Sequence, residues 1–129
     1  MEYTLPTPLP NLEVEHLKAT FKQMIETLGF PITYMSRTDS GEDSYGHPIY
    51  SFSNQTFKAI VTNISDREYQ FVEPGLLPTH YAKLFLYQVT PKIGDRISYV
   101  NIEWEVRGII PMTINGQVIY YEVIIRRRI

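Results

Sequence analysis

The strongest restriction on the fold lies in the C-terminal third of the chain, where Asn115-Gly116 separates two β-type segments. Two-residue hairpin turns prefer Asn-Gly because both central residues adopt positive φ. The segment before this turn alternates apolar with charged residues: Ile102, Glu103, Trp104, Glu105, Val106 and Arg107. Such alternation lets one strand face be buried while the other meets solvent. We therefore predict strands at residues 102–110 and 118–126, with Trp104 as the anchor of the core.

Shorter β-type segments, broken by Gly, Pro, Asn and Asp, predict further strands upstream. They cover residues 32–35, 57–63, 68–72, 82–89 and 95–99, and the last leads into a turn at Val100-Asn101. Closing short antiparallel strands into a small β-barrel, or packing them as a sandwich, removes sheet edges that would otherwise pair promiscuously. A length of 129 residues fits one domain. We predict a mainly β single domain over residues 1–129, with the barrel at 32–129.

One amphipathic helix is predicted at residues 11–29, packed outside the barrel or across one end. Its apolar residues largely recur at three- and four-residue steps: Leu12, Val14, Leu17, Phe21, Met24, Ile25 and Leu28. Asn11 is a suitable N-cap, and Gly29 supplies a C′ glycine before Pro31 stops the helix. Before the helix, Pro6, Pro8 and Pro10 favour an extended proline-rich arm over residues 1–10, which can lie on a neighbouring molecule.

Residues 36–54 contain almost no aliphatic side chain, and we interpret them as a long loop or a flexible hairpin arm. Loops of this length inside small domains are commonly functional or disordered. The segment carries an acidic cluster and one histidine: Asp39, Glu42, Asp43 and His47. The spacing of these carboxylates does not match the twelve-residue EF-hand pattern, which favours a solvated acidic loop over a cation site.

The sequence offers little for catalysis, and we predict a non-enzymatic protein without a cofactor or metal. There is no cysteine, so disulfides and thiol nucleophiles are excluded. His16, His47 and His80 show no metal-ligand spacing. Asp95 with Glu103 or Glu105 could form an acid/base pair, but alternation places both glutamates on a polar strand face.

Charge and hydropathy limit the classes of partner expected for this chain. Twelve Lys plus Arg against fourteen Asp plus Glu give a net charge of −2, which argues against sequence-specific DNA binding. No apolar run is long enough to span a membrane, and the first residues lack a secretory signal, so a cytoplasmic site of synthesis is expected.

Contacts between subunits are the expected use of the exposed aromatic and proline residues. Ten of the seventeen aromatic residues are tyrosines, whose apolar ring and polar tip suit half-buried contact surfaces as well as strands. The three C-terminal arginines form a local positive patch, either a solvated terminus or a partner for acidic groups and nucleic acid. The candidate interface residues are Tyr3, Pro6, Pro8, Tyr45, Tyr50, Arg126, Arg127 and Arg128.

Three C-terminal runs resemble head-closure and head-tail joining proteins of tailed bacteriophages, the stopper-type connectors of the neck. The runs are Pro91-Lys92-Ile93-Gly94-Asp95-Arg96-Ile97, then Tyr99 with Ile102-Glu103-Trp104-Glu105-Val106-Arg107-Gly108-Ile109, and Tyr120-Tyr121-Glu122-Val123-Ile124-Ile125-Arg126. Members of that family carry a Gly-Asp turn, a strand with Tyr or Trp, and a final Tyr-x-x-x-Ile-x-Arg strand on a small β-barrel.

The resemblance implies a virion structural protein that forms a ring of about twelve copies by heterologous contacts between adjacent subunits. Its partners would be the portal or adaptor on one side and the tail or tail-terminator on the other. In such proteins a loop can approach the DNA channel and help retain packaged DNA. By position and length, residues 36–54 would match that loop, with Asp39, Glu42, Asp43 and His47 facing the channel.

Two alternatives remain open. The first is a tail-terminator or tail-completion ring protein, which a helix-rich α+β fold would favour and a closed barrel would not. The second is a stand-alone barrel that binds single-stranded nucleic acid or a small ligand through tyrosines and Trp104. The acidic net charge counts against the second.

Overall fold

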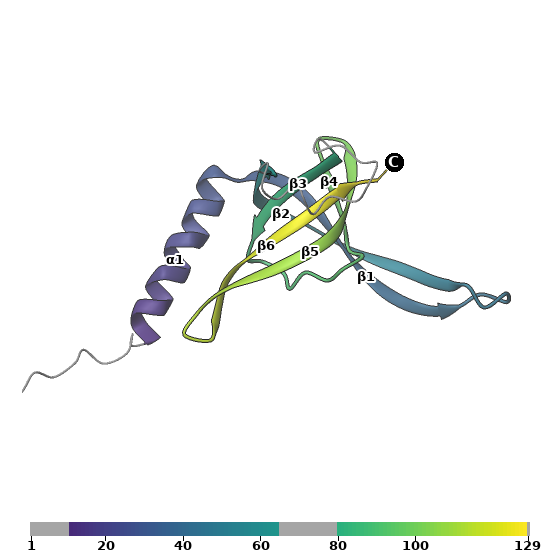
Figure 1. Cartoon of the computed structure of the whole chain (residues 1–129), viewed down its shortest axis with the longest axis horizontal. Coiled ribbons are helices and arrows are strands. Elements are labelled where there is room, and N and C mark those ends of the chain that lie inside the picture. Colours follow the sequence, from purple (N-terminus) through teal and green to yellow (C-terminus); the bar gives the residue numbers. More distant parts are fainter. Residues whose placement is uncertain (1–10, 65–79, 129) are drawn as a thin grey trace, which may run out of the picture.

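The computed structural model describes residues 11–64 and 80–128. Within them lie one helix and six strands: α1 (Asn11–Leu28), β1 (Phe30–Glu42), β2 (Pro48–Asn63), β3 (Tyr81–Leu86), β4 (Arg96–Tyr99), β5 (Ile102–Ile114) and β6 (Gln117–Arg127). The strands are antiparallel and close into a barrel in the order β1-β2-β3-β6-β5-β4 (Figure 1). The predicted class, a mainly β small barrel with one helix, is confirmed. The proline-rich arm and the strand predicted at 68–72 lie outside the described residues.

The core fills the inside of the barrel with alternate side chains of every strand. Trp104 and Val106 of β5 point inward at 7 % and 0 % exposure, while Glu103 and Arg107, on either side of this pair in the sequence, are exposed. The other buried members of this cluster are Ile32, Tyr34, Ala59, Ala82, Leu84, Leu86, Ile97, Val123 and Ile125. Burying each large aliphatic side chain contributes roughly 1.5–3 kcal/mol, so this cluster supplies the main stabilisation of the barrel.

Both predicted tight turns of the C-terminal meander are present. Val100 and Asn101 have φ of 47° and 63°, and Asn115 and Gly116 have φ of 50° and 77°. Positive φ at both central residues is the geometry whose twist matches that of paired strands. β5 runs four residues past the predicted end at 110 and β6 begins one residue earlier than predicted, so the last hairpin is longer than the sequence indicated.

The long loop expected at residues 36–54 is wrong in its secondary structure. β1 runs to Glu42 and β2 starts at Pro48, and the two strands pair through this region in continuous register from Met35↔Asn54 to Asp39↔Tyr50. The strand face that carries Tyr34 inside the barrel continues along residues 36–54 with small hydroxyl side chains in place of large ones. Those positions are occupied by Ser36, Thr38, Ser40, Ser51 and Ser53. The strands continue beyond the core, so no apolar alternation is needed to hold them.

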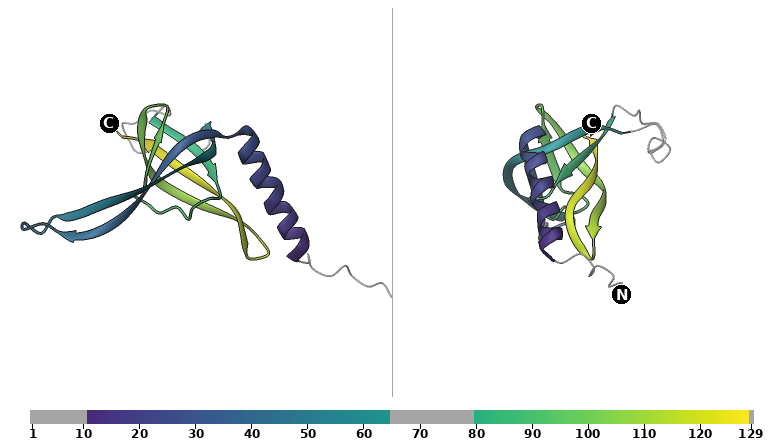
Figure 2. Two further views of the ribbon diagram at one scale, coloured as in Figure 1. Left: turned by 180° about the vertical axis from the view of Figure 1, so that it is seen from behind. Right: turned by 90° about the vertical axis from the view of Figure 1, so that its left-hand side faces the viewer.

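The two strands leave the barrel as a two-stranded ribbon, a name used here for residues 36–56. β1 pairs with β4 over residues 33–35 alone, and β2 pairs with β3 over residues 60–63 alone. Between these limits β1 and β2 have only each other as strand partners among the described residues, and they project well past the barrel wall (Figures 1 and 2). The sequence also allowed a flexible hairpin arm in place of a loop. Of these two predictions, the hairpin arm describes better how the strands of this region are connected.

Helix α1 lies outside the barrel, against β2 and β6 (Figures 1 and 2). Val14 and Ile25 are 1 % and 2 % exposed, whereas Leu28, on the same predicted apolar face, is 69 % exposed. Gly29 ends the helix without a positive φ: its N–H donates to the carbonyl of Ile25 at 2.8 Å, and a Cβ would lie 2.2 Å from that oxygen. A close backbone approach therefore selects the glycine, and not the left-handed cap that the sequence suggested.

Candidate functional site

The ribbon is exposed along most of its length, and several of its apolar side chains are open to solvent. Tyr45 at the tip is 85 % exposed, Ile49 is 43 % exposed and Tyr50 is 41 % exposed. Most exposed surface residues of this kind in a monomer are scattered singly. Here they lie together on one projecting hairpin, which makes the ribbon a candidate surface for contact with another molecule.

The tip of the ribbon is held by Asp43. Its Oδ1 accepts hydrogen bonds from the N–H groups of Tyr45 and His47 at 2.8 and 2.9 Å. The main chain of Asp43 also donates to the carbonyl of His47 at 2.9 Å and accepts from the N–H of Gly46 at 3.1 Å. Aspartate at a turn commonly bonds the backbone that follows it. Asp43 therefore shapes the tip of the ribbon.

The base of the ribbon is fixed by a buried carboxylate, Asp95, which is 0 % exposed. Its Oδ2 accepts from the hydroxyl of Tyr34 at 2.5 Å and from the N–H of Lys92 at 2.9 Å, and its Oδ1 accepts from the N–H of Arg37 at 2.8 Å. Buried carboxylates are tolerated when such donors surround them. Asp95 ties the loop before β4 to β1 at the residue where β1 leaves the barrel.

Arg37 completes this anchor from the ribbon side. Its guanidinium lies over the ring of Tyr50, 4.4 Å from the centroid, and its carbonyl accepts from Nζ of Lys92 at 2.8 Å. Gly94 has φ of 93°, and a Cβ there would lie 2.5 Å from the guanidinium of Arg37. The positive φ favours glycine at this position, and an added Cβ would also require the guanidinium of Arg37 to shift. A second cation, Arg96, lies 4.4 Å from the ring centroid of Phe52 on the same side of the ribbon.

Burial, then the hydrogen bond to Asp95, raises the pKa of Tyr34 well above its ordinary value. The phenol therefore stays protonated and acts as a donor throughout the neutral range. Tyr87 shows the same direction for another reason: its hydroxyl donates to Glu26 of α1 at 2.7 Å, and this bond raises the pKa of Tyr87. The Tyr87 contact ties the helix to the barrel.

The residues predicted to face a channel differ in their exposure and contacts on the ribbon. Asp39 and Glu42 are exposed near the tip. His47 is exposed, with Nδ1 lying 3.4 Å from Oδ2 of Asp43. Asp39, Glu42 and Asp43 are not brought together as a metal site, and within residues 11–64 and 80–128 no three His, Asp or Glu side chains gather to hold a metal ion. Three predicted interface residues, Tyr3, Pro6 and Pro8, lie outside the described residues.

The C-terminal arginines lie at one end of the barrel, on β6 and just after it. Arg128 pairs with Glu103 at 3.0 Å, and Arg96 approaches the same carboxylate at 3.5 Å. Arg127 is exposed and Arg126 is half-buried with partners of its own. Glu103 is thus part of a surface ion-pair group, while Asp95 is buried in the ribbon anchor. The structure therefore gives no acid/base pair between them.

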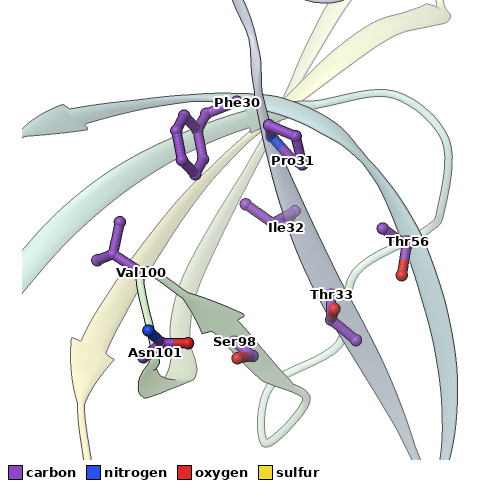
Figure 3. A pocket seen from close by; sticks show the side chains of 8 residues that line it. All are labelled: Phe30, Pro31, Ile32, Thr33, Thr56, Ser98, Val100 and Asn101. Atoms are coloured by element: carbon purple, nitrogen blue, oxygen red, sulfur yellow. The ribbon is translucent and has the colours of Figure 1, made fainter.

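Several hollows open on the surface that the described residues form. One of them, about 490 Å³ in volume, opens where β1 and β4 diverge; Figure 3 shows its lining, Phe30, Pro31, Ile32, Thr33, Thr56, Ser98, Val100 and Asn101. It has hydroxyl and amide groups but no acid or base. An apolar cleft of about 170 Å³ separates α1 from the barrel, beside the rings of Phe21 and Tyr120, whose centroids are 4.8 Å apart. The third, about 260 Å³, opens beside Arg37 and Lys92 at the ribbon base.

Sequence reasoning missed the anchor of the ribbon. Gly94-Asp95 was visible as a turn that enters a strand, and the glycine was the one signal of a tight approach. Tyr34 and Arg37 are about sixty residues away in the sequence, at separations of 61 and 58. No local pattern in the chain could pair them with Asp95. Among the described residues, no helix combines the length and the apolar character needed to cross a membrane.

Comparison with known proteins gives a likeness in fold. No protein-family model matches the chain, and no curated protein matches it. Among solved structures, the solution structure of protein SF1141 from Shigella flexneri 2a is similar, with 17 % sequence identity and a TM-score of 0.54. The alignment covers 78 % of this chain and 92 % of that one. At this identity the likeness shows the architecture alone, a small barrel-like sheet with a helix.

Proposed function

We propose that this chain is a non-enzymatic structural subunit of a bacteriophage neck, one copy in a ring between the portal or adaptor and the tail. The family assignment comes from the three C-terminal sequence runs described above. The observation that supports an assembly role is the ribbon, which projects from the barrel with Tyr45, Ile49 and Tyr50 exposed.

A ring needs contacts between different patches on adjacent copies. The ribbon reaches away from its own barrel, and α1 presents Leu28 and Met24, 69 % and 38 % exposed, on the other side of the molecule. Two separate surfaces of one chain are thus available for heterologous contacts. The anchor of Asp95, Tyr34 and Arg37 keeps the direction of the ribbon fixed relative to the barrel, which such a contact requires.

Two features favour this proposal over its alternatives. The closed barrel argues against a helix-rich tail-terminator fold. Trp104 is 7 % exposed, so its indole is not available to stack on a nucleobase. The proposal also includes retention of packaged DNA by the ribbon. Asp39 and Glu42 lie near its tip, and their negative charges would act on DNA by repelling the phosphate backbone and not by binding it.

The test is assembly onto the portal. A shortened variant replaces residues 39–50 by Asn-Gly, joining the paired residues Thr38 and Ser51 through a two-residue turn. We expect circular dichroism and thermal unfolding to change little, because the removed residues contribute nothing to the core. Electron microscopy should then show portal particles with a neck ring for the natural chain and without one for the variant.

A matched control is Gln23→Ala on an exposed helix position, which should assemble like the natural chain. Absence of any ring with the natural chain on portal particles would refute the neck assignment. Normal ring formation by the shortened variant would refute the role of the ribbon in it.

A further inference from the structure

The outer edge of β2 in the ribbon is an open strand edge without protection. Natural proteins guard exposed edges with charged side chains, proline, bulges or short length. Residues 49–56 read Ile-Tyr-Ser-Phe-Ser-Asn-Gln-Thr and contain no charge, no proline and no glycine. β2 has no register shift over residues 50–56, and no described strand lies beside this edge.

The direction of the backbone groups along β2 follows from three hydrogen bonds. The carbonyl of Lys58 accepts from Nε2 of Gln88 at 2.9 Å, on the side away from β1. Arg37, which pairs with Phe52, has its N–H and its carbonyl bonded on the side away from β2, to Asp95 and Lys92. Successive residues of a strand alternate in this direction. The N–H and C=O groups of residues 50, 52, 54 and 56 therefore point away from β1, toward the open side.

The edge of β1 in the same ribbon is closed to pairing. The main chain of Arg37 is already used by Asp95 and Lys92. Asp39 and Glu42 place charges on it, and the register shifts between these two residues around Gly41, whose φ is 102°. After Glu105, β5 has no strand partner on the side of β4. This free edge is protected in another way, by Pro111. Of these three edges, only that of β2 lacks a guard.

We infer that the open edge of β2 pairs, in antiparallel fashion, with the same edge of a second copy of this chain. A two-stranded ribbon in water is marginally stable, and a third strand stabilises it. The partner strand must bring an unguarded, uncharged edge of similar length, and each copy supplies one. A two-fold axis near Ser53 pairs Tyr50 with Thr56 and Phe52 with Asn54 of the second copy, which sets aromatic side chains beside β-branched and amide ones.

This dimer is a state of the free protein and does not depend on the proposed function. A cyclic ring is built from heterologous contacts, whereas the β2 pairing is isologous. In a neck ring the ribbon would exchange its two-fold partner for a ring neighbour. Failure of portal binding would therefore leave the inference untouched, and failure of the dimer would leave the neck proposal untouched.

Amide hydrogen exchange of the full chain, followed by NMR together with sedimentation velocity, tests the pairing. In a monomer, the amides of residues 50, 52, 54 and 56 exchange quickly while their odd-numbered neighbours are protected by β1. In the dimer we expect the even-numbered amides to exchange at least about tenfold more slowly. A monomer by sedimentation up to the concentrations used for NMR, or fast exchange at all four even-numbered amides within a dimer, would overturn the inference.

Substitutions locate the contact. The double change Asn54→Lys with Thr56→Lys adds the charges that guard an edge and should abolish the dimer. The control, Thr38→Lys with Ser40→Lys, places the same charges on β1 of the same ribbon and should leave the dimer intact. Equal loss in both variants, or loss in neither, contradicts pairing through β2.

Because the natural chain has no cysteine, disulfide cross-linking gives an independent answer. Ser53→Cys should form a disulfide-linked dimer under mild oxidation, since residues next to the two-fold axis come within the Cα separation that a disulfide spans. Ser40→Cys, which is also exposed but lies on β1, should not. A cross-link at residue 40 and none at residue 53 would place the contact on the other edge and refute the proposal.

Discussion

The hydroxyl of Tyr34 donates a hydrogen bond to the carboxylate of Asp95 across a sequence separation of 61 residues. Both side chains are 0 % exposed, and they join β1 to the loop before β4 at the base of the projecting ribbon. Since Asp95 also accepts hydrogen bonds from the N–H groups of Arg37 and Lys92, one buried carboxylate connects the two segments that orient the ribbon. The stability and the geometry of the ribbon therefore depend on this group.

Tyr34→Phe should destabilise the barrel. It removes one donor from a buried carboxylate and leaves the ring in place, so the free energy of unfolding should fall by roughly 1–3 kcal/mol. Urea denaturation followed by circular dichroism measures it. The control is Tyr87→Phe, which removes an exposed bond to Glu26 and should cost clearly less. Equal losses would mean that Asp95 is well satisfied without the phenol.

Stability should fall on the alkaline side because of Tyr34. Its folded pKa is raised by burial and by the bond to Asp95, whereas in the unfolded chain it is about 10. Below that pH both states keep the proton and the contribution is complete. Above it the unfolded chain releases a proton that the folded chain retains, so the free energy of unfolding decreases as pH rises.

Ultraviolet absorbance of the phenolate checks this expectation, since Tyr34 should ionise only when the barrel unfolds. In Tyr34→Phe the absorbance step that accompanies alkaline unfolding should shrink by one phenolate. Tyr45→Phe removes a phenol that is 85 % exposed and should leave that step unchanged. A Tyr34 that ionises in the folded state would contradict the pKa shift.

Gly94→Ala should disturb the ribbon anchor. Its φ of 93° disfavours any side chain, and a Cβ would lie 2.5 Å from the Arg37 guanidinium. The matched control is Gly116→Ala, where φ is 77° and no atom lies within 4 Å of the added carbon, so only backbone strain acts. We expect Gly94→Ala to be the more destabilising of the two by about 1 kcal/mol or more in thermal or urea unfolding. Equal effects would show that Arg37 moves aside without cost.

Asp43→Ala should loosen the tip and not the barrel. It removes the acceptor for the N–H groups of Tyr45 and His47. Amide exchange in residues 43–47 should become faster, while the free energy of global unfolding changes by less than about 0.5 kcal/mol, because the tip makes no core contact. Asp39→Ala, an exposed residue of the same ribbon, is the control and should leave the exchange of these amides unchanged. A large loss of global stability on Asp43→Ala would contradict a local role.

The sequence alone determined the elements whose signals are local. The apolar spacing from Val14 to Ile25 predicts α1, and Asn115-Gly116 predicts the last hairpin because positive φ is a property of those residues themselves. Alternation around Trp104 likewise predicts which face of β5 is buried, since the strand period fixes side-chain direction. These features combined to predict the mainly β barrel with one helix.

The tertiary structure decided what depends on partners far away in the chain. Residues 36–56 contain almost no aliphatic side chain because the ribbon has no core beneath it, so their pairing cannot be read from hydropathy. The burial of Asp95 depends on Tyr34, Arg37 and Lys92 arriving as donors, which requires β1 and the loop before β4 to be adjacent. Local patterns encode period and turn geometry. Only closure of the barrel determines which distant groups share one buried site.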